Sequence, residues 1–155
     1  MNLRALILLP LVVLLFSCSD DDNPTDENPV IENPLLNHPY PQKWELFKTK
    51  GAFEGSEATG EDMEWQETYM LYSDSTFTKT RVKKNGTMTG HGTFSIVENE
   101  GEVFFSLTYT DKDNPIIVSC SGNNEEHLYF RPDEEALING AVICDWGSSF
   151  YKIVK

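Results

Sequence analysis

Residues 65–97 read WQETYMLYSDSTFTKTRVKKNGTMTGHGTFSIV and alternate between short β-type runs and turn residues. Trp65, Tyr69 and Leu71 recur at a spacing of two, as side chains on one face of a strand do. The dipeptide Asn85-Gly86 is the strongest short hairpin signal, because both residue types tolerate positive φ. The stretch therefore predicts three antiparallel strands joined by hairpins.

The second and third of these runs each show a further pattern on one face of the expected strand. Residues 75–82 alternate threonines with Phe77, Lys79 and Arg81, and we expect this strand to be half-exposed. In the next run Gly90 and Gly92 lie on one face. Such a glycine pair suits a sharp bend or a close contact with the neighbouring wall, as at a barrel corner.

The same pattern continues through the second half of the chain, with strands every 8–12 residues and no ten-residue amphipathic helix. This spacing predicts an all-β fold, either an antiparallel up-and-down barrel of about eight strands or a β-sandwich. The longest irregular stretch, residues 50–64, is interpreted either as a wide first loop over a barrel mouth or as unstructured chain. The expected strands are residues 43–49, 65–72, 75–82, 87–97, 102–109, 116–120, 127–131, 137–144 and 149–154.

The N-terminus carries a leader. Arg4 precedes an apolar run over residues 6–16, which is too short to cross roughly 30 Å of hydrocarbon as a helix and fits a secretory signal. The run ends in Leu15-Phe16-Ser17-Cys18, which resembles the lipobox of bacterial lipoproteins. That resemblance implies cleavage after residue 17, a diacylglycerol thioether on Cys18 and an acylated amine. Two or more chains anchor a protein stably, at about 0.8 kcal/mol per buried methylene.

The acidic triplet Asp20-Asp21-Asp22 resembles the surface-export signal of lipoproteins in the Bacteroidota, which implies the outer face of the outer membrane. The alternative is a solvated tether that faces the periplasm. Prolines recur near every fifth position up to residue 42 and favour extended chain. We therefore expect a signal peptide over residues 1–17, a lipidated linker over 18–42 and one domain over 43–155.

The charge of the mature chain limits its partners. Removing the leader removes one of the 12 Lys and Arg residues and none of the 25 Asp and Glu residues, so 11 − 25 gives −14. Nucleic acids and anionic lipids require clustered basic residues, and we expect neither as a partner. The linker's contact with the membrane is through the lipid, and we expect a monomer.

Two cysteines besides Cys18 fall in a compartment that permits disulfides. A bridge between Cys120 and Cys144 would close a loop of about 25 residues, worth about 3–4 kcal/mol in the chain-entropy model. The alternative is two small buried thiols that do not meet, because the sequence does not fix their distance.

The domain resembles the lipocalin-like domains of small Bacteroidota lipoproteins. The matching features are Trp44-x-Leu46 on the first strand, a long first loop, residues 72–77 across a hairpin, residues 92–96 on the fourth strand and a terminal Phe150-Tyr151 strand. The chain departs from the lipocalin opening Gly-x-Trp, since Pro41 and Gln42 precede Lys43. The resemblance implies an eight-stranded barrel with room inside for side chains or one small ligand.

Six aromatic residues are candidates to face the barrel interior. They either fill the core or line a cavity for a small apolar or aromatic molecule. The six are Trp44, Trp65, Tyr69, Phe94, Phe105 and Tyr109.

The chain shows no pattern for a catalytic or metal site, and we expect no enzyme, no metal and no cofactor. The three histidines are scattered, and Pro115 interrupts the faint calcium-loop pattern of residues 111–114. The pairs in 125–126 and 133–135 are adjacent carboxylates, which point to opposite faces of a strand, and we interpret them as solvated loop charge. No serine lies in a nucleophile-elbow context.

Three functions remain open. The first is a lipid-anchored, surface-exposed lipoprotein whose barrel binds a small apolar ligand. The second is a module that binds a surface glycan or a protein through exposed residues such as Trp146. The third is an accessory or inhibitor subunit of an envelope complex. We favour the first, by analogy with the fold.

Overall fold

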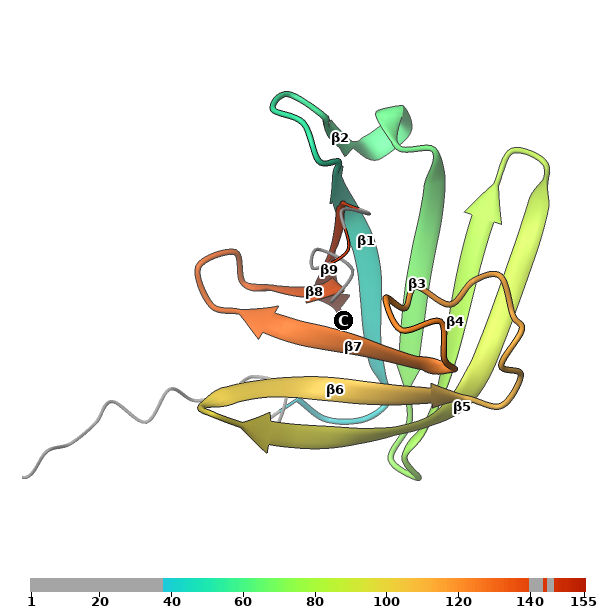
Figure 1. The fold of residues 1–155 in the computed structure, drawn as a ribbon, viewed down its shortest axis with the longest axis vertical. Coiled ribbons are helices and arrows are strands. Elements are labelled where there is room, and N and C mark those ends of the chain that lie inside the picture. The colour runs from blue at the N-terminus through green and yellow to red at the C-terminus, as the bar shows by residue number, and fades with distance from the viewer. Residues whose placement is uncertain (1–37, 140–143, 145–146) are drawn as a thin grey trace, which may run out of the picture. The chain divides into compact units, whose positions relative to one another are not determined.

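A computed structural model of the chain describes residues 38–139, 144 and 147–155, and all of these lie within the unit Glu32–Lys155. Within these described residues the chain forms nine strands and one short 3-10 helix of three residues (Figure 1). The elements are β1 (Gln42–Lys50), β2 (Glu57–Thr59), η1 (Gly60–Asp62), β3 (Trp65–Leu71), β4 (Thr76–Lys83), β5 (Gly86–Asn99), β6 (Glu102–Tyr109), β7 (Glu125–Arg131), β8 (Ala136–Asn139) and β9 (Ser148–Val154).

The strands form one antiparallel sheet that closes on itself. Its order is β2-β1-β3-β4-β5-β6-β7-β8-β9, and β1 also pairs with β9. Eight strands thus make a closed barrel, and β2 is an addition to its edge. The predicted antiparallel up-and-down barrel, of the kind found in lipocalins, is confirmed, and the alternative of two stacked sheets is not what forms.

Strand β1 pairs with three other strands, because two of them pair with different halves of the same edge. Its first half, Gln42 to Glu45, pairs with β3, whereas Lys48 to Lys50 pair with β2, and its other edge pairs with β9 throughout. A register shift between Leu46 and Lys48 bends the strand at this point. The irregular stretch predicted for residues 50–64 therefore contains β2 and η1, which lie at one end of the barrel.

The hairpins form where turn residues predict them. The backbone N–H of Thr76 donates to the Asp74 carboxylate at 3.1 Å, and Ser75 takes a φ of 64°. Lys83 pairs with Gly86 across the second hairpin. Glu100 and Gly101 both have positive φ, 52° and 81°, as a type I′ turn requires.

Two of the expected strands differ in the structure. Residues 116–120 form a loop, because Pro115 lacks an N–H and the Asn114 side chain accepts the backbone N–H of Ile116 at 3.1 Å, which offers the chain a turn in place of a ladder. Ile116 itself is fully buried against the barrel. Of the strand expected over residues 137–144, β8 covers Ala136–Asn139, and residues 140–143 lie outside the described part of the chain.

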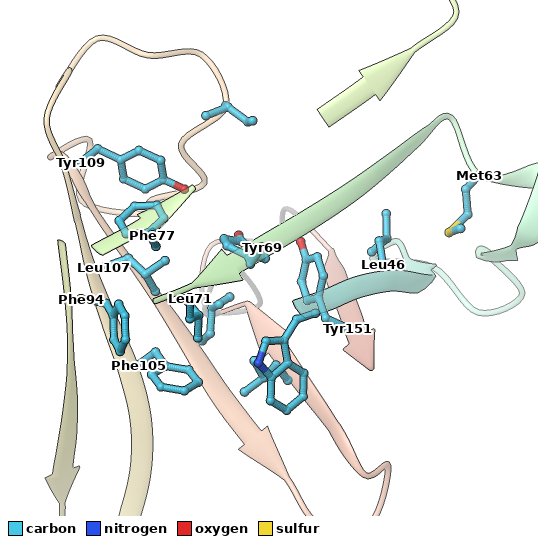
Figure 2. Close-up of a cluster of buried hydrophobic side chains, with 14 residues drawn as sticks. Leu46, Met63, Tyr69, Leu71, Phe77, Phe94, Phe105, Leu107, Tyr109 and Tyr151 are labelled. Carbon is cyan, nitrogen blue, oxygen red and sulfur yellow. The ribbon is translucent and has the colours of Figure 1, made fainter. Parts of the chain in front are cut away.

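Aromatic rings in the barrel core pack against one another edge to face. Phe94 meets Phe105 with ring centres 5.5 Å apart, and Phe77 meets Tyr109 at 4.9 Å (Figure 2). Gly90 makes room for this packing, since a Cβ there would lie 2.8 Å from the Tyr109 ring. The close wall contact predicted at the glycine pair is present, and at Gly92 a Cβ would lie 2.0 Å from the carbonyl oxygen of Thr108.

Candidate functional site: a charged barrel interior below a cleft at the mouth

The middle of the barrel holds a lysine with its ammonium group out of reach of solvent. Lys79 lies on β4 and is 0% exposed. Its Nζ donates to both carboxylate oxygens of Glu126 at 3.0 and 3.1 Å, and to the carbonyl oxygen of Ile116 at 3.0 Å. It also lies 3.2 Å from Oε1 of Glu67. A buried ammonium requires such pairing, because an unpaired charge in the interior is very costly.

Two tyrosines complete the shell of Glu126. The hydroxyl of Tyr69 donates to Oε1 at 2.8 Å, and that of Tyr109 donates to Oε2. The carboxylate, which is 1% exposed, thus accepts from three side chains that come from β3, β4 and β6. This arrangement ties the walls of the barrel together at one level.

A second carboxylate lies one level nearer the mouth. Glu67 on β3 accepts from the Arg81 Nε–H and, at 2.6 Å, from the Tyr151 hydroxyl. Register explains why Glu67 and Arg81 meet, since the two residues are directly opposite each other in the β3–β4 ladder. With Lys79 and Glu126, the interior holds two cations and two anions and is neutral as a group.

The pKa values follow from burial and from these partners. Burial alone would raise the pKa of Glu67, but the charges of Lys79 and Arg81 and the hydrogen bonds from Arg81 and Tyr151 outweigh it, so its pKa is lowered. Burial would lower the pKa of Arg81, and Glu67 reverses this and raises it. The pKa values of Tyr69, Tyr109 and Tyr151 are raised well above the ordinary value, first by burial and then by nearby carboxylates.

One sequence-based interpretation is wrong at this cluster. Residue Glu126 was expected in solvated loop charge and lies inside on β7. The strand expected to be half-exposed does alternate in burial, and its buried face is the one that carries Lys79 and Arg81. The physical reason is mutual neutralisation across the barrel, which strand alternation does not reveal. One signal was available: Glu67 shares the face of Tyr69 and Leu71, and Arg81 is opposite it in a hairpin that the turn fixes.

A cleft of about 480 Å³ lies above this cluster, at the end of the barrel where β1 and β4 finish. Its lining comes from β1, β2, η1, β3, β4, β8, β9 and the loop after Pro115. The β3–β4 register gives the depth: Trp65 and Lys83 are the outermost inward pair, and Glu67 and Arg81 are the next. Arg81 is therefore at the floor of the cleft, where the packed interior begins.

Two cations flank the indole ring of Trp65 in the cleft. The guanidinium carbon of Arg81 lies 4.9 Å from the ring centre, and the ammonium nitrogen of Lys83 lies 5.4 Å from it. The indole Nε1–H is shielded from solvent, and it is the buried side-chain polar atom that lacks a hydrogen-bond partner within residues 38–139, 144 and 147–155. Ala58, Ile117 and Val118 supply apolar surface to the wall.

The structure separates the six aromatic candidates. Trp65 lines the cleft, whereas the other five lie in the hydrophobic core and are at most 9% exposed. Those five fill the barrel interior, and the core-filling alternative holds for them. The five are Trp44, Tyr69, Phe94, Phe105 and Tyr109.

A disulfide lies beside this end of the barrel. Cys120 and Cys144 are joined, so the loop between β6 and β7 is tied to the connection between β8 and β9. The same loop is held to the barrel wall by the amide of Asn114, which donates to the carbonyl oxygen of Thr89 at 3.0 Å. Residues 111–114 form a polar turn in which Asp111 accepts the backbone N–H of Asp113.

Several sequence-based expectations fall outside the described residues: the signal peptide, Cys18 with its acidic triplet, and Trp146. Among the residues that are described, no helix is long and apolar enough to cross a membrane. Within that same part of the chain, His, Cys, Asp and Glu side chains do not gather in threes as a metal site would need.

Comparison with known proteins gives no relative. No protein-family model, no curated protein and no solved structure matches the chain.

Proposed function

We propose that the protein is a lipoprotein, anchored through Cys18 to the outer membrane with its barrel at the cell surface, and that the barrel binds a small ligand in the cleft at its mouth. The observation that carries the binding role is the cleft itself. Its volume of about 480 Å³ falls within the range of roughly 300–1,000 Å³ typical of small-molecule sites. The lining of the cleft combines charged side chains with apolar ones, as is typical of small-molecule sites.

The position of the cleft limits where in the barrel a small ligand can bind. The barrel below Arg81 is occupied by the Lys79 cluster and the aromatic core, so a ligand lies at the mouth and reaches no deeper than the guanidinium group. Because the lining mixes apolar and charged residues, the ligand has both kinds of surface.

Native mass spectrometry of the protein purified from its own host tests this role. We expect a co-purifying small molecule that is lost in Ala58→Trp, because Ala58 lines the cleft and an indole there takes up part of the space that a ligand would occupy. The matched control is Thr59→Trp, one residue further on β2 at an exposed position outside the lining. A bare mass for the unmodified protein, with no molecule that shifts its melting temperature in a screen, would contradict the proposal.

The anchor is tested separately by metabolic labelling with an alkyne fatty acid. We expect Cys18→Ser to lose the label and the double variant Cys120→Ser/Cys144→Ser to keep it, since only the former removes the lipobox cysteine. Protease shaving of intact cells tests the orientation, and complete protection would place the domain on the periplasmic side instead.

A second candidate function is glycan binding, favoured by an aromatic cluster on the outer face of the barrel. Phe104 lies 5.1 Å from His127 and 4.9 Å from Tyr129, measured between ring centres, and all three are half-buried. Rings of this kind can stack on a sugar face. A glycan array probed with the wild type and with Tyr129→Ala would test it, and equal signals from both proteins would exclude this surface.

A further inference from the structure

We infer that the cleft at the barrel mouth takes a small monocarboxylic acid, with the carboxylate on Arg81 and the apolar body against Ala58, Ile117 and Val118. This inference rests on the proposed binding role and names the chemical class of its ligand.

The guanidinium group of Arg81 has donors left over. Its Nε–H is taken by Glu67, whereas its two terminal nitrogens make no hydrogen bond to any residue of the described chain. A guanidinium group carries five N–H donors in a planar fork, and the two terminal nitrogens match the two oxygens of a carboxylate. Because Arg81 lines the cleft, these donors are at the place where a ligand would arrive.

Glu67 and Trp65 hold the fork in place. The carboxylate of Glu67 fixes one edge, and the ring of Trp65 lies 4.9 Å from the guanidinium carbon. An arginine restrained on both sides loses little side-chain freedom when it binds, which favours affinity. This arrangement distinguishes Arg81 from Arg131, which pairs with Glu102 at 3.2 Å on an exposed part of the barrel.

The charges around the cleft select a single negative charge on the ligand. Three cations, Lys50, Arg81 and Lys83, contribute to the lining, and Lys50 is within 3.5 Å of Glu57. Asp62 and Glu64 also line the cleft. Glu67 already offsets the charge of Arg81, and Asp62 and Glu64 add negative charge to the lining, so a phosphate ester or a dicarboxylate would be repelled. Lys83 is left to balance one negative charge. A monoanion fits, with Lys83 as the nearby second cation.

The apolar wall sets the rest of the ligand. Ile117 and Val118 come from the loop between β6 and β7, Ala58 comes from β2, and all three line the cleft. Since the interior below Arg81 is packed, a long straight chain cannot enter carboxylate first beyond the guanidinium. The body of the acid is therefore short or cyclic and remains in the cleft. A hollow at the opposite end of the barrel, lined by Tyr40, Tyr72 and Asp74, has no cation in its described lining.

The test compares acids with their own amides. The probes are phenylacetate, 3-phenylpropionate and hexanoate, each with the matching carboxamide, titrated by calorimetry into the full domain. We expect each acid to bind about tenfold or more tightly than its amide, because a charge-assisted hydrogen bond to arginine is replaced by a weaker one. Arg81→Lys should lower the affinity for the acids by about tenfold or more, since lysine lacks the planar fork.

The control variant is Arg131→Lys, which leaves the cleft unchanged and should bind the acids as the wild type does. Circular dichroism of Arg81→Lys establishes that the barrel is folded, and the comparison of acid with amide in the wild type stands even if that variant is not. Equal affinities for acid and amide, unchanged binding in Arg81→Lys, or no binding of any probe would overturn the inference. A co-purifying molecule that is uncharged and is lost in Ala58→Trp would also overturn it, while leaving the proposed binding role in place.

Discussion

At the scale of single residues, Lys79 is the buried charge that links several elements inside the barrel. An ammonium group in this position would be destabilising by itself, and three acceptors from Glu67, Glu126 and the Ile116 carbonyl make it acceptable. The arrangement is also specific, because each acceptor comes from a different element. A sheet that closed in another register would leave at least one charge unpaired, so this cluster favours one barrel over its alternatives.

We predict that Lys79→Met lowers the free energy of unfolding by about 3–5 kcal/mol, because it leaves two buried carboxylates without their shared cation. Urea unfolding followed by tryptophan fluorescence measures it. Lys84→Met, in the exposed turn between β4 and β5, should stay within about 0.5 kcal/mol of the wild type.

The double variant Lys79→Met/Glu126→Leu separates pairing from packing. It removes one cation and one anion together, so it should recover part of the stability lost in Lys79→Met. If the two substitutions instead destabilised the barrel additively, the pair would not be coupled and the account of Lys79 would be wrong.

At the scale of elements, the loop between β6 and β7 does more than connect two strands. It carries Ile116, whose side chain is buried and whose carbonyl oxygen accepts from Lys79, and Ile117, which lines the cleft. The loop has no ladder of its own, so its position depends on Asn114 at one end and on the disulfide at the other. The conformation of this loop therefore affects both the charged interior and the shape of the cleft.

We predict that Cys120→Ser/Cys144→Ser lowers the free energy of unfolding by about 3–4 kcal/mol, the chain-entropy value for cysteines 24 positions apart. Urea unfolding in the presence and absence of reductant measures it. The reduced wild type should match the double variant, and the variant should not respond to reductant. A wild type whose stability is the same in both conditions would show that the bridge does not contribute.

At the scale of the whole molecule, the interior charges make stability depend on pH. The pKa of Glu67 is lowered in the folded state, so folding favours its ionised form. Its contribution is complete above the ordinary value of 4.5 and is lost as the pH falls through the lowered value. The three buried tyrosines act at the other limit, since their raised pKa values favour the protonated form, and their contribution is lost as the pH rises past 10.

We predict that Glu67→Gln flattens the acid side of this profile. The wild type should lose stability steadily below about pH 4.5, and the variant, although less stable at neutral pH, should lose less over the same range. Urea unfolding at a series of pH values gives both slopes. Glu54→Gln, at an exposed position between β1 and β2, should keep the wild-type slope, and a Glu67→Gln slope equal to it would refute the assignment.

The sequence by itself determined an antiparallel all-β fold, the positions of its hairpins and the alternation of inward and outward residues along its strands. It left barrel and sandwich open, and the pairing of β1 with β9 decided for the barrel. Period-two alternation and turn residues such as Asn85-Gly86 act over a few neighbouring positions, so they can be recognised without knowing what lies across the sheet. The aromatic residues of the core were found in the same way.

Only the tertiary structure decided that Lys79, Arg81 and Glu126 lie inside. Alternation assigns a residue to one of two faces, but a charged side chain can face inward only if opposite charges reach it from elsewhere. Glu126 is 47 positions from Lys79 and on the other side of the barrel, and this distance is closed by the sheet as a whole. The same long-range closure placed Arg81 at the floor of a cleft and left five of six aromatic candidates in the core.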